Sequence, residues 1–209
     1  MKIWRTSLPA TEAANTFFGV QPYSSPLEGT MYFGGDWDTV TNLIATLHST
    51  GVKVRYIAEM VTELNRRLFR RLFELLAPPD LLADSCLMVM GSEGRAEQIL
   101  KTDQDNGLIL RDGTAFPGLE ELLRRFTEHL ISFGYPPCPG NVMVSNPAWA
   151  KPLSAFEDNL RQWVRQPDQQ AQLDLAIFYD AVAVAGDPSL LVAAKRSLLE
   201  RLGDNDSFL

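Results

Sequence analysis

Residues 86–106 read CLMVMGSEGRAEQILKTDQDN, and this stretch decides the fold. It opens with a short, continuously apolar run, Cys86 to Met90, which is typical of a strand that is buried on both faces. The run stops at Gly91, where a Gly-Ser turn is expected to leave the strand and lead into a short helix over residues 94–100. A second strand is predicted over residues 105–111. The stretch therefore predicts a strand, a turn, a short helix and a second strand.

Helices are predicted on both sides of this stretch, because apolar residues recur there at three- and four-residue steps. They cover residues 37–49, 57–76, 119–130, 152–164, 169–185 and 188–202. A third strand is predicted over residues 142–145. Residues 1–35 are rich in Gly, Pro, Ser and Thr. They show neither the two-residue period of a strand nor the 3.6-residue period of a helix, and they are expected to be irregular.

Composition excludes several classes of protein. The chain has 209 residues, of which 45% are apolar, which is enough for one or two hydrophobic cores. Its net charge of −7 argues against nonspecific binding of nucleic acid, which depends on cationic side chains. The apolar runs are too short to span a bilayer, and the first residues lack the apolar stretch of a secretory signal. We therefore expect a cytoplasmic protein with no membrane and no nucleic acid among its partners.

The two cysteines, Cys86 and Cys138, are far apart in the sequence. They show no metal-ligand spacing, and there are only two histidines to assist them. A structural zinc site and a disulfide framework are therefore not expected.

Candidate chemistry is concentrated in residues 91–106. The turn at Gly91 and Ser92 exposes backbone N–H groups at the start of a helix, where an anionic phosphate is favoured. Asp103 and Asp105 are two positions apart at the start of a strand, so both carboxylates lie on one face. Such a pair repels itself unless a divalent cation is shared, as in phosphoryl and nucleotidyl transfer. The pattern predicts a site for a polyphosphate and a metal ion.

The same motif carries a family resemblance. Its Gly-Ser and Asp-x-Asp elements resemble the DNA polymerase β-type nucleotidyltransferase superfamily, and the fuller string is similar to the PII-protein uridylyltransferases and glutamine synthetase adenylyltransferases. Three strings, GSEGRAEQILKTDQDN, CPGNVMVSNPAW and LDLAIFYDAVAVAGD, resemble putative nucleotidyltransferases that are often fused to CBS or cyclic-nucleotide-binding domains. The similarity covers roughly residues 40–209.

The resemblance implies an α+β fold: a small mixed sheet of nucleotidyltransferase type, flanked by helices, preceded by a long helix and followed by a helical subdomain. We expect an irregular segment over residues 1–35 and a nucleotidyltransferase-like domain with leading helices over residues 36–150. Residues 151–209 would form a helical region that binds the acceptor substrate.

The resemblance also implies roles for individual residues. Gly91 and Ser92 would contact the triphosphate, while Asp103 and Asp105 would be the catalytic carboxylates that hold Mg²⁺ or Mn²⁺. On charge alone, Arg95 and Lys101 are further phosphate-binding candidates. Active members of the superfamily use a third carboxylate on a later strand, and the strand predicted at residues 142–145 has none. Asp180 is the candidate for this third metal ligand.

Three functions follow as expectations. The first is a bacterial signalling enzyme that moves a nucleoside monophosphate from a nucleoside triphosphate to an acceptor hydroxyl, with a protein as the acceptor and a homodimer as a compatible assembly. The second is a regulatory module that binds nucleotide with weak or no turnover, which the missing third carboxylate would explain. The third is an interaction domain with neither property.

Overall fold

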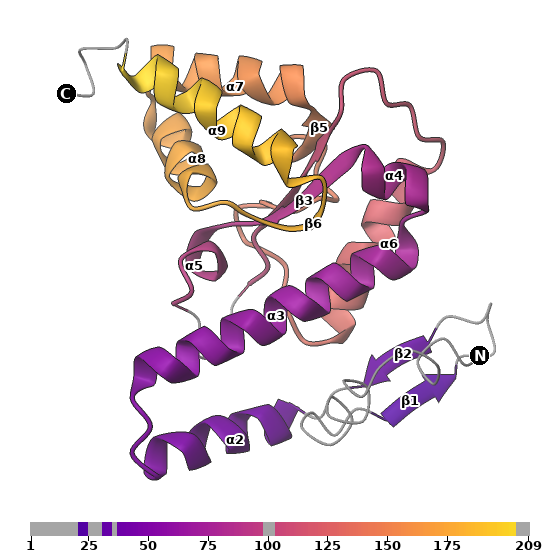
Figure 1. The fold of residues 1–209 in the computed structure, drawn as a ribbon, viewed down its shortest axis with the longest axis vertical. Helices are drawn as coiled ribbons and strands as arrows, with labels where there is room; N and C mark the ends of the chain where they lie inside the picture. Colours follow the sequence, from indigo (N-terminus) through magenta and orange to yellow (C-terminus); the bar gives the residue numbers. More distant parts are fainter. Residues whose placement is uncertain (1–20, 25–30, 35–36, 98–102, 204–209) are drawn as a thin grey trace.

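A four-stranded mixed sheet forms the centre of the computed structural model, which describes residues 21–24, 31–34, 37–97 and 103–203 (Figure 1). Its strand order is β5-β4-β3-β6. Strand β3 (Ser85–Val89) pairs antiparallel with β4 (Asn106–Leu110) on one side and with β6 (Val182–Gly186) on the other. The short strand β5 (Ala150–Pro152) runs parallel to β4. The strands predicted from the apolar run and from the residues after Asp-x-Asp are confirmed as β3 and β4.

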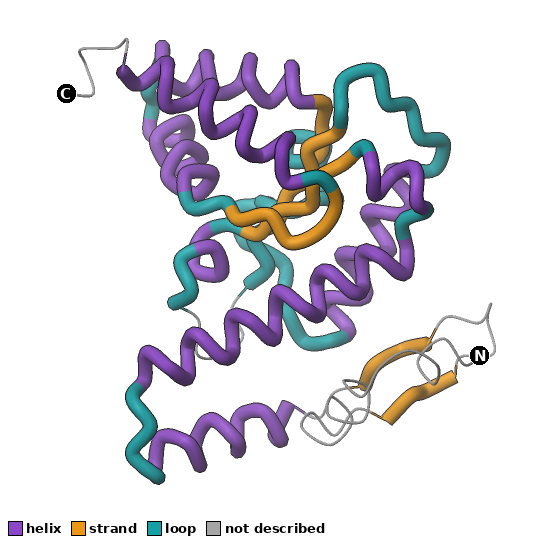
Figure 2. Tube along the Cα trace, viewed as in Figure 1, coloured by secondary structure: helices purple, strands orange, loops and turns teal. Residues whose placement is uncertain are grey.

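Helices cover both faces of this sheet, as Figure 2 shows. Alternate residues of β3 point to opposite faces, so Leu87 and Val89 pack against one layer while Cys86 and Met88 pack against the other. The first layer contains α3 (Val54–Leu76), α4 (Pro79–Ala83) and α6 (Leu119–Ser132), and the second contains α7 (Leu153–Arg165), α8 (Gln169–Tyr179) and α9 (Pro188–Gly203). This double burial explains the unbroken apolar run in the sequence. The predicted α+β class, a small mixed sheet flanked by helices, is confirmed.

The N-terminal elements lie apart from the sheet (Figure 1). Helix α2 (Trp37–Ser49) packs on the first half of α3 through a small apolar cluster of Ile44, Ile57 and Val61. Strands β1 (Gln21–Ser24) and β2 (Met31–Gly34) form an antiparallel pair. The prediction that all of residues 1–35 are irregular is therefore wrong at these two strands. No helix within the described ranges combines the length and the apolar character that a membrane crossing requires.

Three sequence-based elements need correction. Residues 142–145 form a bend and a turn instead of a strand, and the Val144 N–H bonds to the side chain of Asn106 rather than to a neighbouring strand. The helix predicted over 169–185 ends at Tyr179, and the alternating Val-Ala-Val-Ala that follows becomes β6. The helix predicted over 94–100 is instead the single turn α5 (Gly91–Gly94), and residues 98–102 lie outside the described part of the chain.

Strand β6 carries one extra residue relative to β3. Leu87 is opposite Ala185 and Met88 is opposite Ala183, so Val184 bulges out of register. The Val184 carbonyl oxygen accepts a hydrogen bond of 2.6 Å from Nε of Arg70 on α3. The bulge thereby fastens the longest helix to the edge of the sheet.

Candidate metal and nucleotide site

The site begins where the turn after β3 meets the residues that precede β4. The Met90 N–H donates to the Asp105 carbonyl oxygen at 2.9 Å, which holds the two segments together. Gly91 has a φ of +56°, and a Cβ at this position would lie 2.6 Å from Oδ2 of Asp105. Glycine is therefore required twice, for the left-handed backbone and for the close approach of the carboxylate. The predicted proximity of the Gly-Ser turn and the Asp-x-Asp pair is present in the structure.

Asp103 and Asp105 form one group of potential metal ligands with Cys138. One ligand atom from each of the three side chains lies within 4.8 Å of the others. The two aspartates share a face, as their spacing predicts, whereas Cys138 comes from the loop after α6. Sequence reasoning passed over this cysteine, because no local spacing relates it to the aspartates.

Burial has the largest effect on the pKa values of Asp105 and Cys138. Burial raises the pKa of Asp105, and the nearby charge of Asp103 raises it further. A hydrogen bond from the Cys138 thiol and the positive charge of Arg95 act in the opposite direction. Burial, followed by the hydrogen bond to Asp105, raises the pKa of Cys138 to about 11. A cation among these side chains would relieve the repulsion between the two carboxylates.

Asp180, the predicted third ligand, lies beside α5 but is engaged by Arg95. Nη1 of Arg95 is 2.6 Å from Oδ2 of Asp180, and Nε is 2.8 Å from Oε2 of Glu97. A Cβ on Gly94 would come within 2.1 Å of the Asp180 carbonyl oxygen, so α5 and the end of α8 are in close contact. Within the described ranges, the group of metal-capable side chains contains Asp103, Asp105 and Cys138 and does not include Asp180. Lys101 lies outside the described residues.

A buried polar network supports the turn from the side of α3. Glu93, only 3% exposed, accepts a 3.1 Å hydrogen bond from Nδ2 of Asn65 at Oε2. Asn65 in turn accepts a 2.6 Å bond from the hydroxyl of Tyr135. Nη2 of Arg66 donates to the carbonyl oxygens of Glu93 and Gly94. The turn that presents Gly91 and Ser92 is therefore braced by α3.

Glu93 itself is an unusual member of this network. Its Oε1 is buried and has no hydrogen-bond partner among the residues that the structure describes, and burial raises the pKa of Glu93 to about 7. Glu93 lies in the first turn of α5, but a one-turn helix has little dipole, so burial governs the pKa of this carboxyl group.

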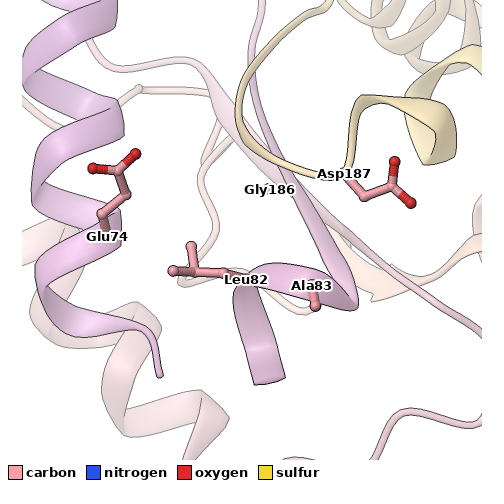
Figure 3. A pocket seen from close by; sticks show the side chains of 5 residues that line it. All are labelled: Glu74, Leu82, Ala83, Gly186 and Asp187. Atoms are coloured by element: carbon pink, nitrogen blue, oxygen red, sulfur yellow. The ribbon is translucent and has the colours of Figure 1, made fainter. Parts of the chain in front are cut away.

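The opposite end of the sheet holds a second acidic group. Figure 3 shows a pocket lined by Glu74, Leu82, Ala83, Gly186 and Asp187. Asp187 accepts from the Ser189 N–H at 2.9 Å, so it caps the start of α9 as its place before Pro188 suggests. Arg111 bridges Asp187 to Asp84 at 2.7 and 2.8 Å. This end is held by ion pairs and has no metal-capable group among the residues that the structure describes.

The arrangement defines a class of protein. A small mixed sheet between helices, with a Gly-Ser turn after one strand and an Asp-x-Asp pair before the next, is a nucleotidyltransferase-type domain. The chain matches the family model "Putative nucleotidyltransferase DUF294" over residues 38–170, more than half of its length, and it belongs to that family. This confirms the family resemblance seen in the sequence. A comparison with curated proteins found no match.

Proposed function

We propose that this chain transfers a nucleoside monophosphate from a nucleoside triphosphate to a hydroxyl group of a protein, in a regulatory or signalling role. The observation that supports the proposal is the contact of the Asp105 carboxylate with the turn at Gly91, beside Asp103. In the reaction, the hydroxyl oxygen forms a bond to the α-phosphorus and loses its proton to solvent. The bond from the α-phosphorus to the β-phosphate breaks, and pyrophosphate leaves.

Different residues of the site would bind the metal ion and the phosphates. Asp103 and Asp105 would hold Mg²⁺ or Mn²⁺, since carboxylate oxygens suit both ions. The ion would neutralise the charge of the triphosphate and orient it for displacement. Backbone N–H groups at Gly91 and Ser92 would contact the phosphate oxygens, and Arg95 would add a charged donor. Because α5 is one turn long, direct N–H and guanidinium contacts would bind the phosphates more strongly than the helix dipole.

The acceptor and its binding region are proposed from the family branch that the sequence resembles, the uridylyltransferases and adenylyltransferases that modify proteins. Residues 151–209 supply α7, α8 and α9. Helix α8 contacts α5, so this helical layer adjoins the proposed nucleotide site. We assign acceptor binding to this layer, and the matched region of the family covers its first part.

The decisive experiment removes both carboxylates. Asp103→Asn combined with Asp105→Asn should abolish metal-dependent binding of nucleoside triphosphate, while stability stays the same or rises slightly because like charges are removed. Calorimetric titration with Mg²⁺ and each common nucleoside triphosphate measures binding, and thermal unfolding measures stability. The matched control is Asp84→Asn with Asp158→Asn, which changes the charge equally on exposed side chains away from the site. Unchanged binding in the first variant would refute the site.

One observation favours the second function, a nucleotide-binding regulatory module without turnover. The carboxylate expected to complete the metal site, that of Asp180, is paired with Arg95. The two functions differ in a single assay. Incubation with α-labelled nucleoside triphosphates and a bacterial lysate should label a protein if the chain is a transferase, whereas a binding module would bind the nucleotide and transfer no label.

A further inference from the structure

Cys138 is placed as a third ligand of the proposed metal site. Its ligand atom lies within 4.8 Å of those of both aspartates. Ligands at about 2.0 to 2.3 Å from a tetrahedral ion are about 3.5 Å apart, so each pair of ligand atoms lies within about 1.3 Å of the separation that one ion requires. Small rotations of the three side chains would therefore bring all of them onto a single ion.

The loop around Cys138 is fixed to the Asp-x-Asp segment on both sides. Before the cysteine, Gln104 pairs with Pro137, and the Gln104 N–H donates to the Pro136 carbonyl oxygen at 3.0 Å. After it, the Asn106 N–H donates to the Val142 carbonyl oxygen at 3.0 Å. Because the residues that alternate with the aspartates hold the loop, Cys138 stays beside them whether or not an ion is bound.

The donor set of two carboxylates and one thiol differs in chemistry from three carboxylates. Mg²⁺ prefers oxygen ligands, whereas a thiolate favours Zn²⁺, Co²⁺ and similar ions. Three protein ligands also match catalytic zinc sites, which leave a fourth position open for substrate. In this site, the open position would suit a phosphate oxygen.

From this geometry we infer that Cys138 is the third metal ligand and makes the site select a thiophilic divalent ion over Mg²⁺. The inference rests on the proposed function, because it adds a ligand to the metal site that function requires. When sulfur binds the ion, the thiol releases its proton to solvent, so one positive charge leaves as the ion arrives. Cys138 thus takes the place that the sequence assigned to a third carboxylate.

The test uses the full chain and Co²⁺ as a spectroscopic probe. Wild-type protein should develop a thiolate-to-cobalt charge-transfer absorption, and Zn²⁺ should displace it at far lower concentration than Mg²⁺. Cys138→Ser should remove the absorption and weaken Zn²⁺ binding by about tenfold or more, while changing Mg²⁺ binding much less. Cys138→Asp should also remove the absorption but shift the preference towards Mg²⁺ by about tenfold.

The control is Cys86→Ala, which removes the other cysteine, a fully buried core residue, and should leave the cobalt absorption intact. Persistence of the absorption in Cys138→Ser, or equal Zn²⁺ affinity in that variant and the wild type, overturns the inference. Absence of the absorption in wild-type protein that still binds Mg²⁺ and nucleotide through Asp103 and Asp105 also overturns it, and leaves the proposed function standing. A cobalt site lost in Cys138→Ser, in a protein that binds no nucleotide, supports the ligand and contradicts the function.

Discussion

Acidic side chains lie at both ends of the central sheet, but they are paired with arginine at one end and lie beside each other at the other. At the end where β3 begins, Arg111 bridges Asp84 and Asp187, and the pKa of Asp187 is lowered, first by its hydrogen bonds from Ser189 and then by Arg111. At the other end, Asp105 is partly buried beside Asp103, and its pKa is raised. In the first group Arg111 neutralises the carboxylates. In the second group an added cation would relieve the repulsion between Asp103 and Asp105. This contrast distinguishes a structural acidic cluster from a candidate active site.

Glycines make close contacts at both ends, and replacing them should give the largest effects on stability. In Gly94→Ala the new Cβ would lie 2.1 Å from the Asp180 carbonyl oxygen, so we expect a loss of about 3 kcal/mol in the free energy of unfolding. Urea titration measures it. Gly186→Ala, with a contact of 2.0 Å to the Ser85 carbonyl oxygen at the opposite end, should cost at least as much, because its φ of +81° is also unfavourable for alanine.

The two glycine variants should then differ in function. Only Gly94→Ala is expected to weaken nucleotide binding by the folded molecules, because it displaces Asp180 and the turn that carries Arg95. Gly203→Ala is the control, since its Cβ would have no neighbour within 4 Å among residues 21–24, 31–34, 37–97 and 103–203. Equal nucleotide affinity in Gly94→Ala and Gly186→Ala would remove the functional difference between the two ends.

The next effect is a pH dependence of stability that comes from Glu93. Its pKa of about 7 in the folded protein exceeds the ordinary value of 4.5, so the folded state binds the proton more tightly than the unfolded state. The resulting stabilisation is fully present below pH 4.5 and is lost as the pH rises towards 7. Glu93→Gln should remove this slope and be more stable than wild type at pH 8, by about 2 to 3 kcal/mol.

Chemical unfolding at a series of pH values measures the Glu93 effect. The matched control is Glu63→Gln, which changes an exposed carboxylate on α3 that is paired with Arg67. This variant should keep the wild-type dependence of stability on pH. A Glu93→Gln protein with the same slope as wild type would show that Glu93 does not carry the proton uptake.

The smallest effect is expected at the ion pairs of the opposite end. Arg111→Met removes the bridge between Asp84 and Asp187, but these side chains are exposed, and surface ion pairs contribute little to stability. The change in the unfolding midpoint should be barely resolvable and should vanish at high salt, and nucleotide binding should stay at the wild-type level. A loss of nucleotide binding here would mean that the two ends are coupled.

The sequence predicted the parts of the fold that local patterns determine. Strands β3 and β4 follow from an apolar run and from Asp-x-Asp, and the amphipathic period predicted α3 and α6. Strand β6 was assigned to a helix, because Val182 to Gly186 continues a helical apolar pattern and only its pairing with β3 makes it a strand. The Val-Ala alternation alone does not decide between helix and strand, because strand propensity depends on tertiary context.

The candidate site likewise contains residues that local spacing predicts and residues that only tertiary contacts bring in. Gly91, Asp103 and Asp105 are recognisable because their roles require fixed spacings in one stretch of chain. Cys138 and Asn65 come from distant segments, and pairing between Gln104 and Pro137 or packing of α3 brings them to the site. The assignments of Asp180 as a metal ligand and of Arg95 as a phosphate ligand stay predictions that nucleotide titrations can test.

The extra residue in β6 restricts how the length of this strand can vary. Because Ala183 and Ala185 already face the same layers as their partners Met88 and Leu87, deleting Val184 would leave each remaining residue of β6 on its present face. The deletion would instead remove a buried side chain of the first layer and the carbonyl oxygen that binds Arg70. A single codon lost at any other position in the strand would turn the residues on one side of the change to the other face of the sheet.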